Sequence, residues 1–208
     1  MINALTGKKV SIVSEKPQTT RFKIGGVVNR TEGQIVFVDT PGFHKPKDAL
    51  GEFLISQVTE TIKEVDLVLF LVDGSRELNE EDRLLMEEIN KTQLPCLLVI
   101  TKKDLASAEA ISALEQEVKK VLPLQKAVTV SAVTGEDLDL LLKKIFPFLP
   151  EGSALYPEDI VTDYPLSIQA AEIIREKVLM NLHQEVPHSV AVSVKRLEEK
   201  PEKNLIAI

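Results

Sequence analysis

Short, nearly continuous apolar runs alternate with amphipathic segments, and this alternation constrains the fold more than any other feature. The amphipathic segments carry apolar side chains at helical spacing, as at Ile111, Leu114 and Val118. A strand that is apolar at almost every position has to be covered on both faces. The sequence therefore predicts an α/β fold with a mostly parallel sheet between layers of helices. The expected strands lie at 22–29, 34–39, 66–72, 95–100 and 126–131, and the expected helices at 78–90, 106–122 and 138–149.

Pro, Gly and Tyr-Pro pairs cluster between residues 147 and 165, and punctuation of that density predicts a domain boundary. We expect a first domain at 1–150, a linker at 151–166 and a smaller second unit at 167–208. In parallel sheets of this class, ligands gather at the carboxyl ends of the strands. The motifs that carry chemistry are therefore expected in the first domain, after its strands.

The second unit predicts one helix and about two strands. Residues 167–182 have helical spacing, with Ser167 as the expected N-cap, and 190–196 is typical of a strand. A further strand is expected from residue 204. One helix and two strands cannot enclose a core of their own, so this unit is expected to be part of a larger one.

The net charge of −7 over 208 residues gives no global basic field, and no DNA partner is expected. Basic residues are enriched locally in residues 1–30, where six Lys or Arg accompany Glu15 alone. Such an excess is typical of a solvated basic face, and it also fits a loop near a polyphosphate or RNA.

Cys96 is the single cysteine and lies inside an apolar run, which is typical of a buried thiol in a reducing compartment. No apolar run approaches the roughly 20 residues of a membrane span. The first residues lack the charged segment and apolar core of a signal peptide. We therefore expect a cytoplasmic location, with peripheral membrane contact left open.

The sequence Asp-Thr-Pro-Gly follows the apolar run at 34–39. A strand that ends in Asp-x-x-Gly is how P-loop GTPases present a carboxylate to the water shell of Mg²⁺ and a glycine amide to the γ-phosphate. Asp39 is the expected metal-site residue, and Gly42 is expected to approach the γ-phosphate because it has no Cβ. Taken alone, Thr-Pro-Gly is also good turn chemistry. The candidate nucleotide-binding residues here are Asp39, Thr40, Pro41, Gly42 and Phe43.

Phe43 stands where many regulatory GTPases carry the glutamine that positions the attacking water. A phenyl ring has no hydrogen-bonding group, so it cannot do this. Hydrolysis is expected to use another group, a water held by the backbone, or help from a partner. Gly42 and Thr20 are the candidate catalytic residues.

The sequence Thr-Lys-Lys-Asp follows the expected strand at 95–100, and its Asp104 lies 65 residues after Asp39. One carboxylate can accept hydrogen bonds from both N1–H and N2–H₂ of guanine, and Asp104 fits that role with the Lys102 stem along the ring. Guanine sites usually have Asn where this chain has Thr101, whose hydroxyl offers one donor fewer. A helix-capping turn would also explain the motif. The candidate residues are Thr101, Lys102, Lys103 and Asp104.

The sequence Ser-Ala-Val follows the apolar residues 127–130 of the expected strand at 126–131, and Ser131 lies 27 residues after Asp104. The N–H of Ala132 is expected to meet guanine O6. Three small residues carry no weight alone, but the order, the spacing and the strand-end placement of the three motifs together predict a guanine-nucleotide site. The candidate residues are Ser131, Ala132 and Val133.

A polar loop within the basic region precedes the expected strand at 22–29. A threonine in such a loop can place its hydroxyl on Mg²⁺ and its backbone near the γ-phosphate. Thr20 is favoured over Thr19 as the second metal-site residue, although for this segment taken alone an ordinary polar loop is the better explanation. The candidate residues are Gln18, Thr19, Thr20 and Arg21.

Together these segments resemble the Era family of bacterial GTPases, and the resemblance covers essentially all 208 residues. It implies GTP hydrolysis with Mg²⁺, GTP or GDP as bound nucleotide, and a C-terminal KH domain. It also implies binding near the 3′ end of the 16S rRNA of the small ribosomal subunit during ribosome maturation, with some peripheral membrane association. The oligomeric state is left open. The resemblance rests on Pro17–Arg21, Asp39–Phe43, Lys102-x-Asp104, Ser131-Ala132 and the stretch 156–190.

Two features of that family do not occur in the sequence. The phosphate loop Gly-x-x-x-x-Gly-Lys-Ser/Thr is absent, and Met1–Gly7 matches the tail of the helix that follows it in the family. The Gly-x-x-Gly turn of the KH domain is also absent. We therefore expect a chain truncated at both ends, without its first strand, in which nucleotide binding is weak, strand edges are exposed and stability is marginal.

The favoured interpretation is an Era-type GTPase that binds small-subunit ribosomal RNA in ribosome assembly. The alternative is a catalytically inactive fragment or degenerate GTPase that acts only as a binding or scaffold protein. That alternative needs a complete RNA-binding surface, and residues 151–208 carry six Lys or Arg against ten Asp or Glu. Another translation-associated GTPase is disfavoured by the stretch 156–190.

Overall fold

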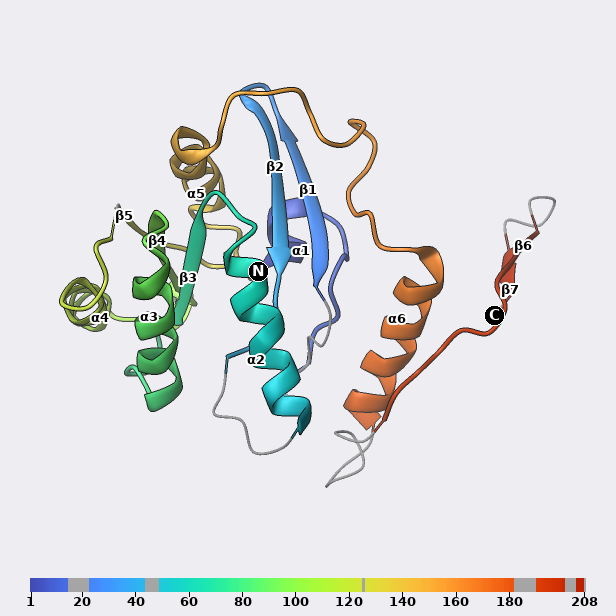
Figure 1. The fold of residues 1–208 in the computed structure, drawn as a ribbon, viewed down its shortest axis with the longest axis horizontal. Coiled ribbons are helices and arrows are strands. Elements are labelled where there is room, and N and C mark those ends of the chain that lie inside the picture. Colours follow the sequence, from blue (N-terminus) through green and yellow to red (C-terminus); the bar gives the residue numbers. More distant parts are fainter. Residues whose placement is uncertain (15–22, 44–48, 125, 182–189, 201–204, 208) are drawn as a thin grey trace.

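The computed structural model describes residues 1–14, 23–43, 49–124, 126–181, 190–200 and 205–207. Helices and strands alternate through most of the chain (Figure 1). In chain order the elements are α1 (Ile2–Thr6), β1 (Ile24–Arg30), β2 (Gly33–Asp39), α2 (Ala49–Ile62), β3 (Val68–Asp73), α3 (Glu80–Thr92), β4 (Cys96–Thr101), the 3₁₀ helix η1 (Lys103–Leu105), α4 (Ala108–Lys119), β5 (Lys126–Thr129), α5 (Leu138–Ile145), the 3₁₀ helix η2 (Phe146–Phe148), α6 (Leu166–Asn181), β6 (Glu198–Lys200) and β7 (Leu205–Ala207).

The central layer is a parallel sheet in the order β3-β4-β5. Its register pairs Phe70 with Leu98 and Leu98 with Ala127. The middle strand, β4, is buried along its length because helices cover both faces of the sheet, as the nearly unbroken apolar run predicts. The α/β fold with a parallel sheet is therefore confirmed.

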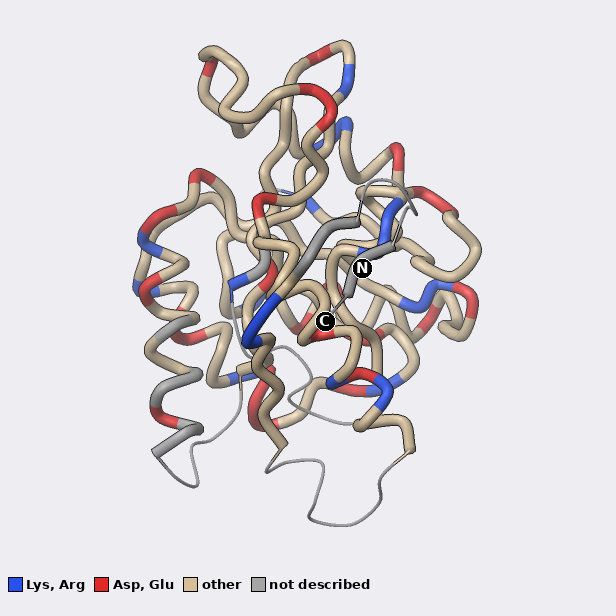
Figure 2. The backbone as a smooth tube through the Cα atoms, turned by 90° about the vertical axis from the view of Figure 1, so that its right-hand side faces the viewer, with Lys and Arg blue, Asp and Glu red and all other residues tan. Residues whose placement is uncertain are grey.

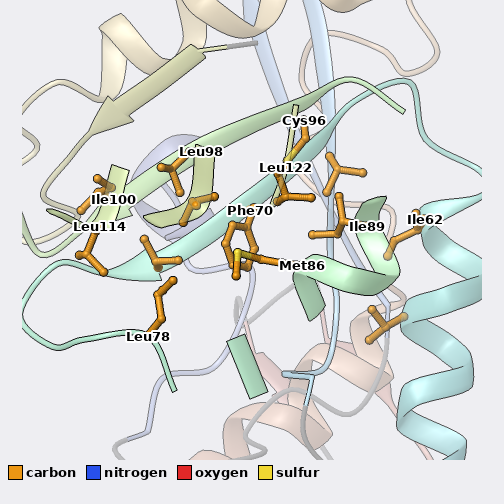
Figure 3. Packing of buried hydrophobic residues seen from close by; sticks show 14 residues of the cluster. Ile62, Phe70, Leu78, Met86, Ile89, Cys96, Leu98, Ile100, Leu114 and Leu122 are labelled. Carbon is orange, nitrogen blue, oxygen red and sulfur yellow. The ribbon is translucent and has the colours of Figure 1, made fainter. Parts of the chain in front are cut away.

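Alternate residues of β4 enter two different hydrophobic clusters. Cys96, Leu98 and Ile100 face the first cluster, which α2, α3 and α4 complete through residues such as Met86 and Leu114. Figure 3 shows Phe70 of β3 and Met86 of α3 within this cluster. Burial raises the pKa of the Cys96 thiol to about 12, so this cysteine behaves as a small apolar core residue.

The second cluster lies on the other face of the sheet. Leu97 and Val99 of β4 pack there with Leu141 of α5. Val28 and Ile35 of the antiparallel hairpin β1-β2 also belong to this cluster, so the hairpin shares the core of the sheet.

The hairpin and the parallel sheet are separate ladders among the described strands (Figure 1). β2 pairs with β1, and β3 pairs with β4. The side chains of Val38 on β2 and Leu71 on β3 are 37% and 41% exposed, which fits incompletely covered strands.

Side-chain caps fix the N-termini of α3 and α4, two of the helices that pack against the first hydrophobic cluster. Asn79 and Asp82 form a capping box at α3: Asp82 N–H donates to Asn79 Oδ1 at 2.8 Å, and Asn79 N–H donates to Asp82 Oδ2 at 2.9 Å. Ser107 caps α4 by accepting from Ala110 N–H at 3.2 Å.

The segment 155–163, between the two expected domains, runs along the β1-β2 hairpin and is hydrogen-bonded to it; it is called the strap below. Val27 N–H donates to Val161 O at 2.8 Å, and the Thr162 hydroxyl donates to Gly25 O at 2.7 Å. A Cβ on Gly25 would lie 2.6 Å from Asp163 Oδ1, so a larger residue there would have to displace the Asp163 side chain. The segment is therefore held against β1, and the proposed division into domains remains a prediction.

Buried charged residues fix α6 to the start of the chain. Glu176 is 3% exposed, pairs with Lys9 and accepts from Val13 N–H at 3.0 Å. Burial favours the neutral acid, but the bonds from Lys9 and Val13 outweigh it and lower the pKa of Glu176. Glu172 accepts from Arg175 on the same helix at 2.6 and 2.8 Å.

The basic enrichment of residues 1–30 is largely neutralised where it is described. Lys9 pairs with Glu176, Lys23 with Glu64 and Arg30 with Asp139. Figure 2 shows Lys and Arg positions interspersed with Asp and Glu positions on the face in view. This arrangement favours a solvated mixed surface for the described part of that region.

Three local expectations differ from the structure. Helix α6 begins at Leu166, so Ser167 lies inside its first turn rather than at the N-cap. Residues 190–196 form no strand; the described strand starts at Glu198 and pairs with β7, because a strand exists only where a neighbour completes its ladder. Helix α2 was not predicted, although Ile55, Val58 and Ile62 have helical spacing.

Within the described residues, none of the helices combines the length and the apolar character that crossing a membrane requires.

Leu98 offers a direct test of the two-sided burial of β4. Its side chain is fully buried, so Leu98→Ala is expected to lower the free energy of unfolding by about 2–5 kcal/mol. Leu71→Ala, at a 41% exposed position of the neighbouring strand, is the matched control and is expected to cost far less. Urea denaturation of both variants measures the difference, and equal losses would contradict the described sheet.

Candidate functional site

Three loops meet at the carboxyl edge of the parallel sheet. The loop after β3 contacts the loop after β4 through Gly74 N–H, which donates to Thr101 O at 2.9 Å. The loop after β4 contacts the end of β5 through Lys103 N–H, which donates to Val130 O at 3.1 Å. The parallel register places these strand ends side by side, so two of the predicted motifs do share one edge.

The loop that carries Thr101 and Asp104 turns sharply after β4. Lys102 has a φ of 57°, and the 3₁₀ helix η1 begins at the next residue. This turn leaves Asp104 exposed to solvent. The Thr101 hydroxyl donates to Val72 O at 2.9 Å, so its proton holds the loop to β3. The expected donation from Thr101 to a guanine ring nitrogen remains a prediction.

Lys102 is oriented by an acid that the sequence analysis did not select. Its Nζ lies 2.7 Å from Asp73 Oδ2, at the end of β3. Asp73 also accepts from Ser75 N–H at 3.0 Å and from the Ser75 hydroxyl at 2.6 Å. Burial works against ionisation, but the bonds from Lys102 and Ser75 prevail and lower the pKa of Asp73 to about 2. The Lys102 stem is thereby drawn along the edge of the sheet.

The Ser131 loop is fixed by one buried hydroxyl. Ser131 is fully buried, and its Oγ accepts from Val133 N–H at 3.3 Å and from Thr134 N–H at 3.1 Å. Ala132 is exposed, and the Val133 side chain is 88% exposed. The loop therefore presents its tip to solvent on a rigid base, as a backbone donor to a ligand requires.

The Asp39–Gly42 segment leaves the end of β2. Asp39 is half-buried and Pro41 is buried, whereas Gly42 is exposed and a Cβ there would meet no atom within 4 Å. Phe43 packs against the first hydrophobic cluster, which anchors the segment on its far side. The open space at Gly42 is compatible with close approach of a phosphate.

The candidate residues Gln18, Thr19, Thr20 and Arg21 lie outside the described residues. Within the described part of the chain, no group of three or more His, Cys, Asp or Glu side chains could hold a metal ion.

Asp73 and Gly74 are the site residues that sequence reasoning missed. A Cβ on Gly74 would lie 2.8 Å from Thr101 O, so glycine allows the β3 and β4 loops to touch. The signal was present, because an Asp-Gly pair directly follows the apolar run at 66–72, in the position that Asp39 has after its own strand.

A family model described as a 50S ribosome-binding GTPase matches residues 1–102. The GTPase Era of Ruminiclostridium cellulolyticum is 41% identical over 200 residues, which cover 96% of this chain and 67% of the relative. The GTPase Era of Alkaliphilus metalliredigens is 40% identical over 208 residues, covering 100% of this chain and 70% of the relative.

Two solved structures are similar over nearly the whole chain. A crystal structure of Era in complex with MgGDPNP and nucleotides 1506–1542 of 16S ribosomal RNA has a TM-score of 0.89 and 39% identity, and covers 97% of this chain and 68% of that one. Aquifex aeolicus Era, as a variant bound to GDP·AlF₄⁻, has a TM-score of 0.88 and 39% identity, covering 97% and 69%.

The parallel sheet, its strand-end loops and these similarities define a GTPase of the P-loop class. Sequence identity of about 40% to GTPase Era, over essentially the full chain, narrows this class to one family. The chain belongs to the Era family of GTPases.

Gly74→Ala tests the contact between the β3 and β4 loops. The new Cβ would crowd Thr101 O at 2.8 Å and Ile100 Cγ2 at 3.0 Å, and a backbone carbonyl cannot swing aside. We expect about a tenfold loss of GDP affinity, because displacement of the loop weakens one charge-assisted hydrogen bond to the base. Isothermal titration calorimetry measures the affinity.

Gly152→Ala is the matched control, since a Cβ at that position meets no atom within 4 Å. It is expected to bind GDP as the unmodified chain does. Equal GDP affinity in the Gly74 and Gly152 variants would show that the contact does not shape the site.

Proposed function

We propose that Asp104 and Ala132 recognise the guanine base at the carboxyl edge of the parallel sheet. The observation that carries the proposal is that the two loops bearing these exposed residues are joined by the bond from Lys103 N–H to Val130 O, 3.1 Å long. Asp104 would accept from guanine N1–H and N2–H₂, and Ala132 N–H would donate to O6. The Lys102 stem, drawn along the edge by Asp73, would cover one face of the base.

The phosphate end of the nucleotide is assigned to the Asp39–Gly42 segment. Gly42 has open space where a Cβ would stand, which fits the approach of a γ-phosphate to its backbone. Asp39 would hold a water of the Mg²⁺ shell, with the Thr20 hydroxyl as the expected direct contact to the metal. Bound Mg²⁺ would neutralise charge on the phosphate oxygens. This chain's own contribution is to hold that carboxylate and that glycine at the end of one rigid strand, β2.

The hydrolysed substrate is proposed to be GTP, with GDP as product. Support comes from the relatives, which are Era structures bound to MgGDPNP and to GDP·AlF₄⁻. No comparison supports the alternative of a catalytically inactive fragment that acts only as a scaffold. Since the phenyl ring of Phe43 packs on the core, water positioning is assigned to the backbone around Gly42 or to a partner.

The macromolecular partner is proposed to be 16S rRNA of the small ribosomal subunit, during ribosome assembly. The support is the similarity, at a TM-score of 0.89, to an Era structure that contains 16S RNA. Residues 1–150 would form the nucleotide-binding domain, and 167–208 would contribute to a KH domain. A cytoplasmic location is proposed from the lone buried Cys96. Peripheral membrane contact stays a prediction.

Asp104→Asn tests base recognition. The amide replaces one acceptor with a donor, so one of the two bonds to guanine is kept and the other becomes a contact between two donors. GDP affinity is therefore expected to fall by about 100-fold or more. Xanthosine diphosphate carries an acceptor at position 2 and is expected to gain affinity for the variant. Competition binding with GDP and xanthosine diphosphate measures whether the variant changes its preference from the first to the second.

Asp159→Asn is the control, because Asp159 is an exposed aspartate of the segment between the domains. It is expected to leave both affinities unchanged. If Asp104→Asn keeps the preference for GDP over xanthosine diphosphate, Asp104 does not read the base.

RNA recognition is tested with an RNA that copies the 3′-terminal segment of 16S rRNA. We expect about tenfold tighter binding than to a scrambled RNA of equal length and composition. Residues 151–208 carry more acidic than basic side chains, so contacts to the nucleobases, rather than to phosphates, have to supply this preference. The affinity is therefore expected to depend only weakly on salt concentration. Fluorescence anisotropy at two salt concentrations measures both, and equal binding of the two RNAs would refute a specific RNA partner.

A further inference from the structure

Lys103 occupies the space between the two loops assigned to the guanine base. It is the first residue of η1 and lies directly between Lys102 and Asp104 in the sequence. Its backbone N–H donates to Val130 O at 3.1 Å, which places it beside the end of β5. None of the roles derived above uses its side chain.

The Lys103 ammonium group forms ion pairs with two consecutive acids of the opposite loop. Its Nζ bonds to Asp137 Oδ2 at 2.7 Å and also to Glu136. The side chain is 31% exposed, which is low for a lysine and shows that its stem is partly covered. The hydrogen bonds that the ammonium donates to Asp137 and Glu136 raise the pKa of Lys103, so the ammonium stays charged.

Both acids belong to the structure that shapes the Ser131 loop. Glu136 O accepts from Ser131 N–H at 3.1 Å, which closes the loop on itself. Asp137 has a φ of 59° and is the N-cap residue that precedes α5, and its carbonyl accepts from Leu141 N–H at 2.9 Å. The base of the Ser131 loop and the first turn of α5 are therefore held by the same ammonium group.

We propose that Lys103 is a specificity-determining positioning residue that sets the spacing between the Asp104 carboxylate and the Ala132 backbone. The inference rests on the proposed guanine site. Lys103 does not touch the base; its side chain bridges the Asp104 loop to the Ser131 loop.

The chemical reason lies in the geometry of the guanine edge. Asp104 and Ala132 are assigned to different groups on the same rigid ring, so their separation has to match that ring. The Thr101 hydroxyl holds the Asp104 loop to β3 and does not reach the Ser131 loop. In the described part of the chain, Lys103 provides the side-chain bonds between the two loops.

Lys103→Met tests the proposal, because it keeps most of the stem and removes the charge. GDP and inosine diphosphate, which lacks the 2-amino group, are titrated against the full chain. We expect about a three- to tenfold loss of GDP affinity, since a partly exposed pair of ion pairs contributes modestly. The preference for GDP over inosine diphosphate is expected to shrink, because the contact to the 2-amino group depends on the position of Asp104.

Two further variants separate positioning from charge and folding. Lys103→Arg keeps the cation and is expected to restore GDP affinity and base preference. Lys119→Met removes another ion-paired lysine, which bonds to Glu115 along α4, and is expected to change neither. Hydrogen exchange of the free protein is expected to quicken at residues 131–137 in Lys103→Met alone.

The outcomes separate a failure of the role proposed for Lys103 from a failure of the proposed guanine site. If the unmodified chain binds GDP and Lys103→Met matches it in affinity, base preference and hydrogen exchange, the inference is wrong and the guanine site stands. An unmodified chain that does not prefer GDP to ADP would refute the guanine site, and this inference with it. If Lys103→Met lowers GDP affinity but keeps the preference for GDP over inosine diphosphate, Lys103 acts only through its charge. That result would contradict its role in positioning the two loops.

Discussion

Burial of β4 on both of its faces determines where the neighbouring strands and the loops of the candidate site lie. Cys96, Leu98 and Ile100 are taken up by one cluster, and Leu97 and Val99 by the other. A strand covered in this way fixes the positions of its parallel neighbours. The loops after β3, β4 and β5 then leave the sheet at one edge, where backbone bonds from Gly74 and Lys103 join them. The candidate site is a consequence of this packing.

Ion pairs link the loops that the parallel sheet brings to one edge. Asp73 holds Lys102, and Lys103 bridges to Glu136 and Asp137, so the Asp104 loop is bonded toward both of its neighbours. Individually such partly exposed pairs contribute little to stability. Their effect here is geometric: they leave Asp104 exposed on a loop that is bonded to the segment preceding Ala132. Preorganisation of this kind is what a specific base site needs.

Much of the fold, and the placement of two candidate loops at one edge of the sheet, could be predicted because the relevant signals are local. The unbroken apolar run of β4 predicts its burial, and Asp104 and Ser131 follow strands whose ends were placed within about two residues. The expected strand at 190–196 was wrong because strand pairing depends on distant residues. Asp73 and Gly74 were missed because their roles arise from contacts with Lys102 and Thr101 across the sheet.

Hydrogen–deuterium exchange with and without GDP shows whether the nucleotide binds at the carboxyl edge of the parallel sheet, because it reports on every backbone segment at once. GDP is predicted to slow exchange at 101–106 and 131–137, while the strap at 155–163 and helix α3 stay unchanged. The groove between α2 and α3, lined by Phe43, Val58 and Leu94, is the competing location. Slowed exchange in that groove, with both strand-end loops unaffected, would contradict the account.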